Sequence, residues 1–587
     1  MKTIYKSVIL SAIGISLTIA ANAQSTSPSD SLLNRQIMLE RDFNPTLQDA
    51  SKINTLPAVH NPVVKQANIQ FETRQPLIEF ERYRLGDTGS GDIKTAVGYD
   101  KKRGYLSLGA GYYSSLYGAL GYKLVNTQTD QLDIFARYNA ISGKVKYAEK
   151  DYLMDEAKGK YENLLVKAKY GHSFEALTWK LQVGYENTGY NYYGNPFDAG
   201  TDEDFEFGKK QSVNVINAET GITSNNNSEF GYDVALMFNN FTSKYGPQIA
   251  NDGVSGNILG ARLNMSAPFG GDKHVGVRSS IMNQSYSDVD FTTQKDKLFH
   301  NLTVVKATPY FDIEGGNYYV SLGANFHYAI DDENKLQIAP NVNLSWQFVD
   351  KSLLYIGATG GINDNNFLDI LRENRYADMN ARVKYSKTLY DATIGIKSGA
   401  IQGFEFDIFG GYKQTNDDHL YVVNSIDRDP AVTSWGNVST PIYNDIKTGH
   451  FGGLLKTTLI PYTDLSAKVV SYFYNGDDYT NENGENTSFE AWNRPKLTVN
   501  VDLNFKPSKE LTFSLNYLMA SGRKAFYEGA SHKMNNINEL NFRGEYQFLD
   551  WLSINASVYN LMNQKYETWA GYTHQGLSAM GGLSLKF

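Results

Sequence analysis

Residues 551–587 read WLSINASVYNLMNQKYETWAGYTHQGLSAMGGLSLKF, and the sequence ends there on an aromatic side chain. As a strand, the last segment would place apolar or small side chains on one face: Leu577, Ala579, Gly581, Leu583, Leu585 and Phe587. Mostly polar or small residues fill the alternate positions, and this period of two residues indicates a strand with two unlike faces. A closed transmembrane β-barrel needs such a last strand, because pairing it with the first strand leaves no free edge. We therefore predict a barrel in which Leu583, Leu585 and Phe587 take part in closure and assembly.

The composition excludes a helical membrane protein and permits a barrel. Charged residues make up 20% of the chain, and the mean hydropathy is −0.42. After the N-terminus the sequence contains no apolar run long enough for a spanning helix, which needs about 20 residues. Barrel strands alternate apolar with polar residues, so a low mean hydropathy is compatible with a barrel. The 41 Tyr and 30 Phe suit aromatic girdles at two membrane interfaces. The alternative is a large secreted β-propeller or β-helix.

Residues 1–23 have the features of a secretory signal peptide. Lys2 and Lys6 precede an apolar stretch at 8–19, and Ala21-Asn22-Ala23 resembles a cleavage site. Removing this segment would leave 53 basic and 63 acidic residues, a net charge of −10 that argues against nucleic acid as a partner. With no cysteine, the chain has no disulfide framework, lipoprotein anchor or thiolate metal site. We expect an exported protein of the outer membrane of a Gram-negative bacterium.

Residues 24–103 differ from the rest of the chain and are expected to form a short N-terminal periplasmic or lumenal segment. They contain five of the fifteen prolines and show no clean helical or strand period. One interpretation is a disordered tail. The other is a segment that folds back into the barrel or docks on a periplasmic partner, because it also carries apolar residues such as Ile37, Phe43 and Leu47.

Residues 104–587 are predicted to form an all-β, antiparallel, up-and-down transmembrane barrel. Strand-like alternation recurs throughout, as where Trp179, Leu181, Val183 and Tyr185 alternate with polar or small residues. Marking each such run gives about 22 strands, with 20 to 24 acceptable. Short connections alternate with mostly longer ones, as periplasmic turns and extracellular loops do in outer-membrane barrels. An even number of strands places both barrel ends on the turn side.

The C-terminal stretch resembles a known family. Asn560-Leu561-Met562-Asn563-Gln564-Lys565-Tyr566, then Gly571-Tyr572 and the strand that ends in Phe587, resemble the end of TonB-dependent receptors. The resemblance covers about the last fifty residues and implies a 22-stranded barrel that imports scarce nutrients with energy supplied through TonB. The chain departs from the family in two places. His574-Gln575-Gly576 stands where many members have Pro-Gly-Arg, and residues 24–103 are too few for the usual plug domain and contain no recognisable TonB-binding box.

Two expected outer loops carry candidate ligand-binding residues. The loop at 190–210 presents Tyr190, Tyr192 and Tyr193 near Asp198, and the loop at 414–446 presents Asp427 and Trp435. Aromatic rings beside carboxylates can stack on and hydrogen-bond sugars or other polar ligands. The alternative is that the aromatic residues belong to a girdle and the acidic residues are simply solvated. Residues 367–373, FLDILRE, are predicted to form a short amphipathic turn that folds over the mouth.

No catalytic motif, cofactor site or metal-spaced histidine pair is recognisable, so we do not expect an enzyme. The favoured function is receptor-like or transporter-like uptake of a polar nutrient across the outer membrane. The alternative is a non-transporting barrel with a closed lumen, a structural or accessory subunit of an outer-membrane complex. Expected partners are outer-membrane lipids, the outer-membrane insertion machinery, and an envelope protein or TonB.

Overall fold

The computed structural model describes the chain from residue 102 onward, with gaps in several links between strands. The described residues are 102–149, 152, 155–195, 197, 209–225, 230–246, 253–287, 301–331, 334–379, 383–423, 437–480, 484 and 486–587. All of them belong to one compact unit, Pro76–Phe587. The predicted signal peptide and nearly all of the N-terminal segment lie outside the described residues.

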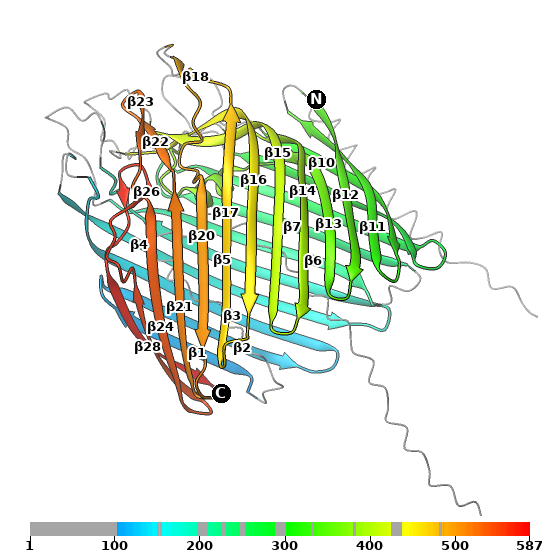
Figure 1. Cartoon of the computed structure of the whole chain (residues 1–587), viewed down its shortest axis with the longest axis horizontal. Helices are drawn as coiled ribbons and strands as arrows, with labels where there is room; N and C mark the ends of the chain where they lie inside the picture. Colours follow the sequence, from blue (N-terminus) through cyan, green and yellow to red (C-terminus); the bar gives the residue numbers. More distant parts are fainter. Residues whose placement is uncertain are drawn as a thin grey trace, which may run out of the picture. The chain divides into compact units, whose positions relative to one another are not determined.

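Twenty-two of the described strands form one closed antiparallel sheet (Figure 1). Its first half consists of β1 (Gly104–Gly111), β2 (Ser115–Asn126), β3 (Asp130–Lys146), β4 (Glu156–Ser173), β5 (Leu177–Tyr190), β6 (Gln211–Ser224), β7 (Gly231–Ser243), β8 (Ser255–Pro268), β9 (Lys273–Tyr286), β10 (Leu302–Glu314) and β11 (Tyr318–Ile330). Its second half consists of β12 (Lys335–Val349), β13 (Ser352–Asn363), β14 (Ser386–Ile401), β15 (Phe404–Val422), β16 (Thr440–Thr457), β17 (Thr463–Gly476), β20 (Leu497–Phe505), β21 (Leu511–Ser521), β24 (Ile537–Leu549), β25 (Leu552–Tyr559) and β28 (Ser578–Lys586). The predicted fold class and strand number are confirmed.

The barrel closes where β28 pairs with β1. Their register runs from Tyr105↔Lys586 to Gly111↔Met580. The last residue extends this pairing, because the backbone of Phe587 and that of Gly104 exchange hydrogen bonds of 2.8 and 2.9 Å. The Phe587 ring also stacks on Tyr122 of β2, with ring centroids 5.9 Å apart. Phe587, Leu585 and Leu583 therefore lie at the closing seam.

Alternation of side chains gives the wall two different faces. On β5, Val183 and Tyr185 are exposed on the outer face, while Glu186 lies on the opposite face, where Asn163 of β4 donates a hydrogen bond of 2.9 Å to it. On the same inner side, Arg262 of β8 pairs with Asp233 of β7 at 2.9 Å. Apolar residues facing lipid and polar residues facing a lumen are the pattern of a membrane barrel.

The connections divide into a turn end and a loop end. Ten links of two to six residues join β2–β3, β4–β5 and their successors at the end that holds both termini of the barrel. At the other end nine of the eleven links are longer, and the exceptions are β1–β2 and β11–β12. The hairpins β18–β19 (Tyr479–Thr480, Asn486–Thr487), β22–β23 (Lys524–Tyr527, Ala530–Lys533) and β26–β27 (Glu567–Trp569, Tyr572–Thr573) belong to these longer links, and β18 and β22–β23 can be followed at the upper end of Figure 1.

The wall is taller on some sides than on others. The strands β1, β25 and β28 at the seam have 8, 8 and 9 residues, whereas β3, β4, β15 and β16 have 17 to 19. A membrane-crossing strand needs about 9 to 11 residues. The pairing of β2 with β3 stops at Ala140 of β3, whereas the pairing of β3 with β4 continues to Lys146. The extra residues of β3 and β4 therefore lie at the loop end of the barrel.

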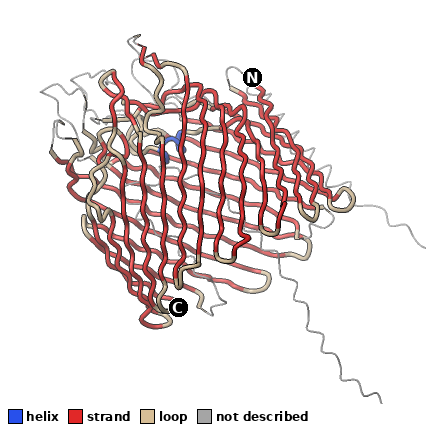
Figure 2. The backbone as a smooth tube through the Cα atoms, in the orientation of Figure 1, coloured by secondary structure: helices blue, strands red, loops and turns tan. Residues whose placement is uncertain are grey.

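One helix, α2 (Phe367–Glu373), lies in the link between β13 and β14. Figure 2 shows it among the loops at the end of the barrel away from the C-terminus. Within the described part of the chain, no helix has both the length and the hydropathy to cross a membrane.

Candidate functional site

The long link between β13 and β14 forms a segment that we call the strap, residues 364–379. Its helix α2 begins after Asn366, whose side chain accepts a hydrogen bond of 2.9 Å from the backbone N–H of Asp369. Such a cap satisfies one of the free N–H groups at a helix start. The apolar residues of the helix, Phe367, Leu368, Ile370 and Leu371, are all buried. The amphipathic turn predicted at 367–373 is thus present as a helix.

Charged side chains fasten the strap to strands on different sides of the barrel. Asp364 pairs with Lys306 of β10 at 2.6 Å, and Arg372 pairs with Glu186 of β5 at 3.5 Å. Seven strands separate β5 from β13 along the wall, and Glu186 lies on the inner face. The strap therefore reaches these partners across the interior of the mouth.

Two further contacts of the strap are aromatic or ionic. The guanidinium of Arg375 lies over the ring of Tyr161 on β4, 4.0 Å from its centroid. At the end of α2, the Glu373 carboxylate pairs with Nε2 of His419 on β15. Cation–π contacts gain strength when they are shielded from water, and Arg375 is buried. With Lys306 and Glu186, these partners hold the strap at four strands of the wall.

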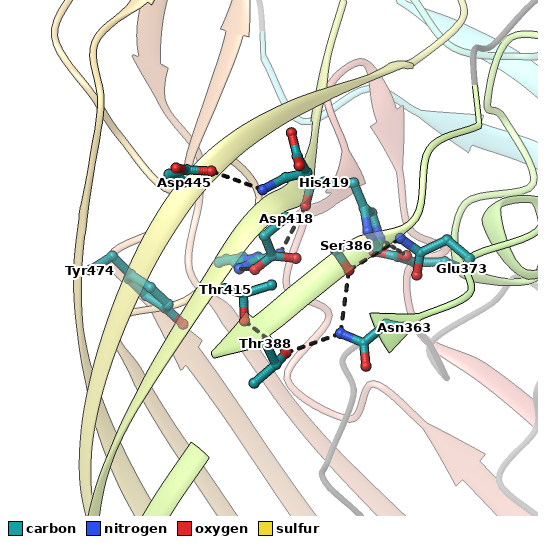
Figure 3. Close-up of polar contacts among 12 residues, drawn as sticks. Asn363, Glu373, Ser386, Thr388, Thr415, Asp418, His419, Asp445 and Tyr474 are labelled. Carbon is teal, nitrogen blue, oxygen red and sulfur yellow. Dashed lines mark hydrogen bonds and ion pairs between the residues drawn. The ribbon is translucent and has the colours of Figure 1, made fainter. Parts of the chain in front are cut away.

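Polar contacts continue from the strap into the long strands β14, β15 and β16 (Figure 3). Asn363 donates a hydrogen bond of 3.1 Å to Thr388, whose hydroxyl lies 3.1 Å from that of Thr415. Next to His419, Asp418 accepts a hydrogen bond of 2.8 Å from Arg494 in the link before β20. Buried polar groups cost free energy unless they are paired, so this network favours one fixed arrangement of the strap's base.

Five tyrosines form a second feature, the tyrosine cluster, at the same end. The members are Tyr190 at the end of β5, Tyr192 and Tyr193 in the following link, Tyr376 of the strap, and Tyr572 of β27. Tyr376 and Tyr572 stack with centroids 3.6 Å apart and planes at 12°. Tyr193 contacts both rings edge-on, at 5.9 and 5.3 Å. Links that are far apart in sequence thus meet in one aromatic core.

The hydroxyl groups of the cluster bind backbone carbonyls of other links. Tyr193 donates to Thr573 at 3.0 Å, and Tyr572 donates to Asn437 at 2.5 Å. Asn437 in turn donates to the carbonyls of Asn195 and Ala570, at 2.7 and 3.0 Å. Burial raises the pKa of Tyr193 and of Tyr572 well above the usual value, so both hydroxyls stay protonated donors.

A buried carboxyl lies beside the cluster in the link between β25 and β28. Glu567 of β26 accepts a hydrogen bond of 2.6 Å from the Tyr152 hydroxyl. Burial raises the pKa of Glu567 to about 7, and the Tyr152 hydrogen bond offsets part of this rise. Arg523 donates a hydrogen bond of 2.6 Å to the Glu567 backbone carbonyl. This carboxyl changes its charge within the physiological pH range.

The residues predicted to bind ligand divide into two groups. Tyr190, Tyr192 and Tyr193 are at most 1% exposed, and their rings pack against other protein groups. In this arrangement they hold the links together and offer no ring face to solvent. Asp198, Asp427 and Trp435 lie outside the described residues. Among the described residues, no group of three or more potential metal-ligating side chains is present.

Sequence reasoning did not anticipate Tyr376, Tyr572 or Asn437. One signal was present in the pair Gly571-Tyr572. Gly571 has φ +79°, and a Cβ there would lie 2.3 Å from Nδ2 of Asn437. Glycine is favoured where the backbone has positive φ or approaches another group closely, and Gly571 meets both conditions. We call the strap and the tyrosine cluster together the loop assembly.

No protein-family model matches the sequence, and no curated protein matches it. Solved structures do match the fold. The ferric enterobactin receptor PfeA of Pseudomonas aeruginosa aligns over 83% of this chain and 80% of its own, with 12% identity and a TM-score of 0.62. The siderophore receptor PiuA of Acinetobacter baumannii aligns over 83% and 82%, with 10% identity and a TM-score of 0.60. The ferripyoverdine receptor of Pseudomonas aeruginosa aligns over 83% and 72%, with 13% identity and a TM-score of 0.58. At these identities the likeness establishes the fold of the barrel.

Proposed function

We propose that this chain is an outer-membrane receptor or transporter that takes up a polar nutrient, and that the loop assembly controls entry to its lumen. The observation that carries the proposal is a closed 22-stranded barrel whose strap crosses the mouth. A barrel of this width encloses a lumen that needs filling or gating, because barrels of 16 to 18 strands already leave an aqueous channel. The solved structures compared above are a siderophore receptor, a ferric enterobactin receptor and a ferripyoverdine receptor, and this supports the receptor class without naming the nutrient.

The proposal includes the N-terminal part of the chain, nearly all of which lies outside the described residues. A signal peptide at residues 1–23 exports the protein, and residues 24–103 form a periplasmic or lumenal segment that gates the barrel from the turn end. The turn end then faces the periplasm, and the loop assembly faces outward. Recovery of TonB with the full chain from envelope extracts would support energised uptake.

The experiment uses the absence of cysteine from the chain. Cysteines at Glu186 and Arg372 can be joined by a bis-maleimide, which ties the strap to β5. The matched control has cysteines at Asp464 and Lys506, joined by the same reagent. These two residues form an exposed ion pair of 3.6 Å at the turn end. Solute entry is measured by swelling of liposomes that contain the purified full chain. We expect the first tether to reduce swelling several-fold and the control tether to leave it unchanged.

A second function has its own support in the structure. The tyrosine cluster is buried and joins the strap to two other links, which suits an accessory barrel that stays shut. If neither the wild type nor a strap-loosening variant, Arg372→Ala with Lys306→Ala, admits solute or passes current, the uptake proposal fails and the accessory role is favoured. If swelling is unchanged when the tether joins positions 186 and 372, the strap does not control entry.

A further inference from the structure

Basic side chains of β4 and β5 face the lumen together. Glu186 marks the inner face of β5, and Lys180 shares this face because side chains alternate along a strand. On β4, Lys169 lies directly opposite Gln182 of β5, and opposite residues point to the same side of a sheet. Lys167 lies two positions before Lys169 and has the same orientation. Three lysines of two neighbouring strands therefore point into the barrel.

Arg137 of β3 continues this group toward the loop end. It lies opposite Leu165 of β4, and Leu165 lies opposite Glu186. Diagonal neighbours on adjacent strands are about 7–8 Å apart, and residues two positions apart on one strand are separated by about 7 Å. Each basic residue is thus a neighbour of the next, over a height of roughly 20 Å at about 3.3 Å per residue. We call these four residues the basic row: Arg137, Lys167, Lys169 and Lys180.

The basic row has no ionic partner in the wall. Within the part of the chain that the structure describes, none of its four side chains forms an ion pair or a hydrogen bond. Nε of Arg137 is buried without a hydrogen-bond partner, and Lys169 and Lys180 are exposed. The residues opposite Lys180 on both sides are Gly171 and Gly221, which offer no side chain. Four like charges therefore lie near one another, and this proximity is unfavourable unless an anion offsets it.

One carboxylate lies beside the row, and a lysine outside the row balances its charge. Asp133 of β3 is opposite Lys169 on one side and opposite Lys123 of β2 on the other. Glu219 of β6 is paired with Arg262, at 3.6 Å. The row therefore keeps a surplus of four positive charges, although the net charge of the whole chain is −8.

Other lysines of the inner wall face carboxylates. Lys413 of β15 lies opposite Asp391 of β14, and Lys456 of β16 lies opposite Glu405 of β15. Opposite charges at facing positions stabilise a sheet. The basic row is thus a local feature of β3–β5, and it distinguishes this sector of the lumen from the sector of β14–β16.

We propose that the basic row binds a solute with two or more anionic groups, carboxylate or phosphate, and guides it from the strap toward the turn end. The inference rests on the proposed uptake function and gives the nutrient a chemical class. Charges of one sign along a wall of low dielectric constant focus the field and concentrate ions of the opposite sign. Lys and Arg that line a passage favour anions and phosphate. Lysines are mobile point charges, so separate positions about 7 Å apart suit a solute that carries several anionic groups.

Two observations favour a solute as the occupant of the row. Residues 24–103 contain 10 acidic and 11 basic residues, so the N-terminal segment brings no net negative charge. The upper end of the row also lies beside the strap, because Arg137 and Glu186 flank Leu165 and Glu186 pairs with Arg372 of the strap at 3.5 Å. The row is therefore placed to receive an anion that passes this ion pair.

The test measures binding of tripolyphosphate and of citrate to the purified full chain in nanodiscs, by titration calorimetry at low ionic strength. Lys167→Gln with Lys169→Gln removes two charges of the row. The matched control, Lys413→Gln with Lys456→Gln, removes two inner lysines that face carboxylates. A third protein, Lys167→Arg with Lys169→Arg, keeps the charge. We expect the first variant to bind the anions about fivefold more weakly or worse, and the other two to stay within about twofold of wild type.

Swelling of liposomes with an uncharged pentose, measured on the same proteins, separates this inference from the proposed function. If the pentose enters but neither anion binds, the uptake proposal stands and the basic row is wrong. The same holds if the control variant, or the arginine variant, loses as much binding as the glutamine variant of the row. If the anions bind through the row but no pentose enters, the binding site stands, and the uptake proposal fails together with the guiding role. Row-dependent binding of only one anion supports the site and narrows the class to phosphates or to carboxylates.

Discussion

The ring of Tyr376 stacks on the ring of Tyr572 with centroids 3.6 Å apart, although one belongs to the strap and the other to the link before the last strand. Both are completely or almost completely buried, and Tyr193 packs against the two together. The edge-on contacts of Tyr193 have the geometry that aromatic pairs prefer, in which each pair contributes about 0.5–1.5 kcal/mol beyond its burial. The three rings together therefore join the strap, the β5–β6 link and the β25–β28 link.

Replacing Tyr572 by alanine should loosen the strap. The change removes the stack and the hydrogen bond to Asn437 and leaves a cavity, a loss of about 3–5 kcal/mol for a buried aromatic side chain. We expect amide hydrogen exchange in residues 367–379 to accelerate by at least tenfold. Tyr572→Phe keeps the stack and should show a smaller effect, near 1 kcal/mol. Equal exchange in wild type and Tyr572→Ala would show that the stack does not hold the strap.

Gly361→Ala should strain the point where β13 leads into the strap. Gly361 has φ +137°, and an added Cβ would lie 2.3 Å from the ring of His327, whose Nδ1 accepts a hydrogen bond from the Ile362 N–H. We expect a loss of about 1–3 kcal/mol, seen as a lower temperature for loss of the compact form on semi-native gels. Gly357→Ala is the matched control on the same strand, because no atom lies within 4 Å of its added Cβ. A similar shift in both variants would exclude a specific clash with His327.

The link that contains Glu567 should be less stable at alkaline than at acidic pH. The pKa of this carboxyl is raised from 4.5 to about 7, so the folded state holds the proton more tightly than the unfolded state. Stability is then highest below pH 4.5, falls as the pH rises through 7, and is lowest above it, by at most about 3 kcal/mol. Hydrogen exchange of residues 567–573, corrected for intrinsic rates, should reveal this dependence. Glu567→Gln should abolish it, and a dependence that survives in this variant would have to come from another group.

Phe587→Asp should lower the amount of assembled barrel. Phe587 completes the seam through its two backbone bonds with Gly104 and its stack on Tyr122. A carboxylate at this outward position disfavours insertion and removes the aromatic end of the strand that the assembly machinery is expected to read. We expect outer-membrane levels to fall several-fold on quantitative immunoblots, whereas Phe587→Tyr should remain near wild type. Normal levels of Phe587→Asp would contradict this role.

The wall could be predicted from sequence because its signals are local. The alternation of apolar and polar side chains from Trp179 to Tyr185 reflects which of them face lipid. Each strand shows this alternation in its own sequence, so no knowledge of the neighbouring strands is needed. The loop assembly could not be predicted in the same way. Tyr192 and Tyr376 have no periodic context, and their partners lie in other links. An aromatic side chain in a long loop suits a ligand site, a girdle or a buried core equally well, and only the path of the backbone decides between them.

The seam also determines the order in which the barrel can form. Ser107 and Ser584 lie 2.8 Å apart across it, yet 477 positions separate them in the chain. Compared with an ordinary hairpin, this closure costs only about 3 kcal/mol more in chain entropy, since each doubling of loop length adds about 0.6 kcal/mol. The separation does, however, delay closure of the barrel, because β28, the partner of β1, is synthesised after all the other strands of the sheet. Until then one edge of β1 is unpaired, and an unpaired strand edge makes a chain prone to aggregation.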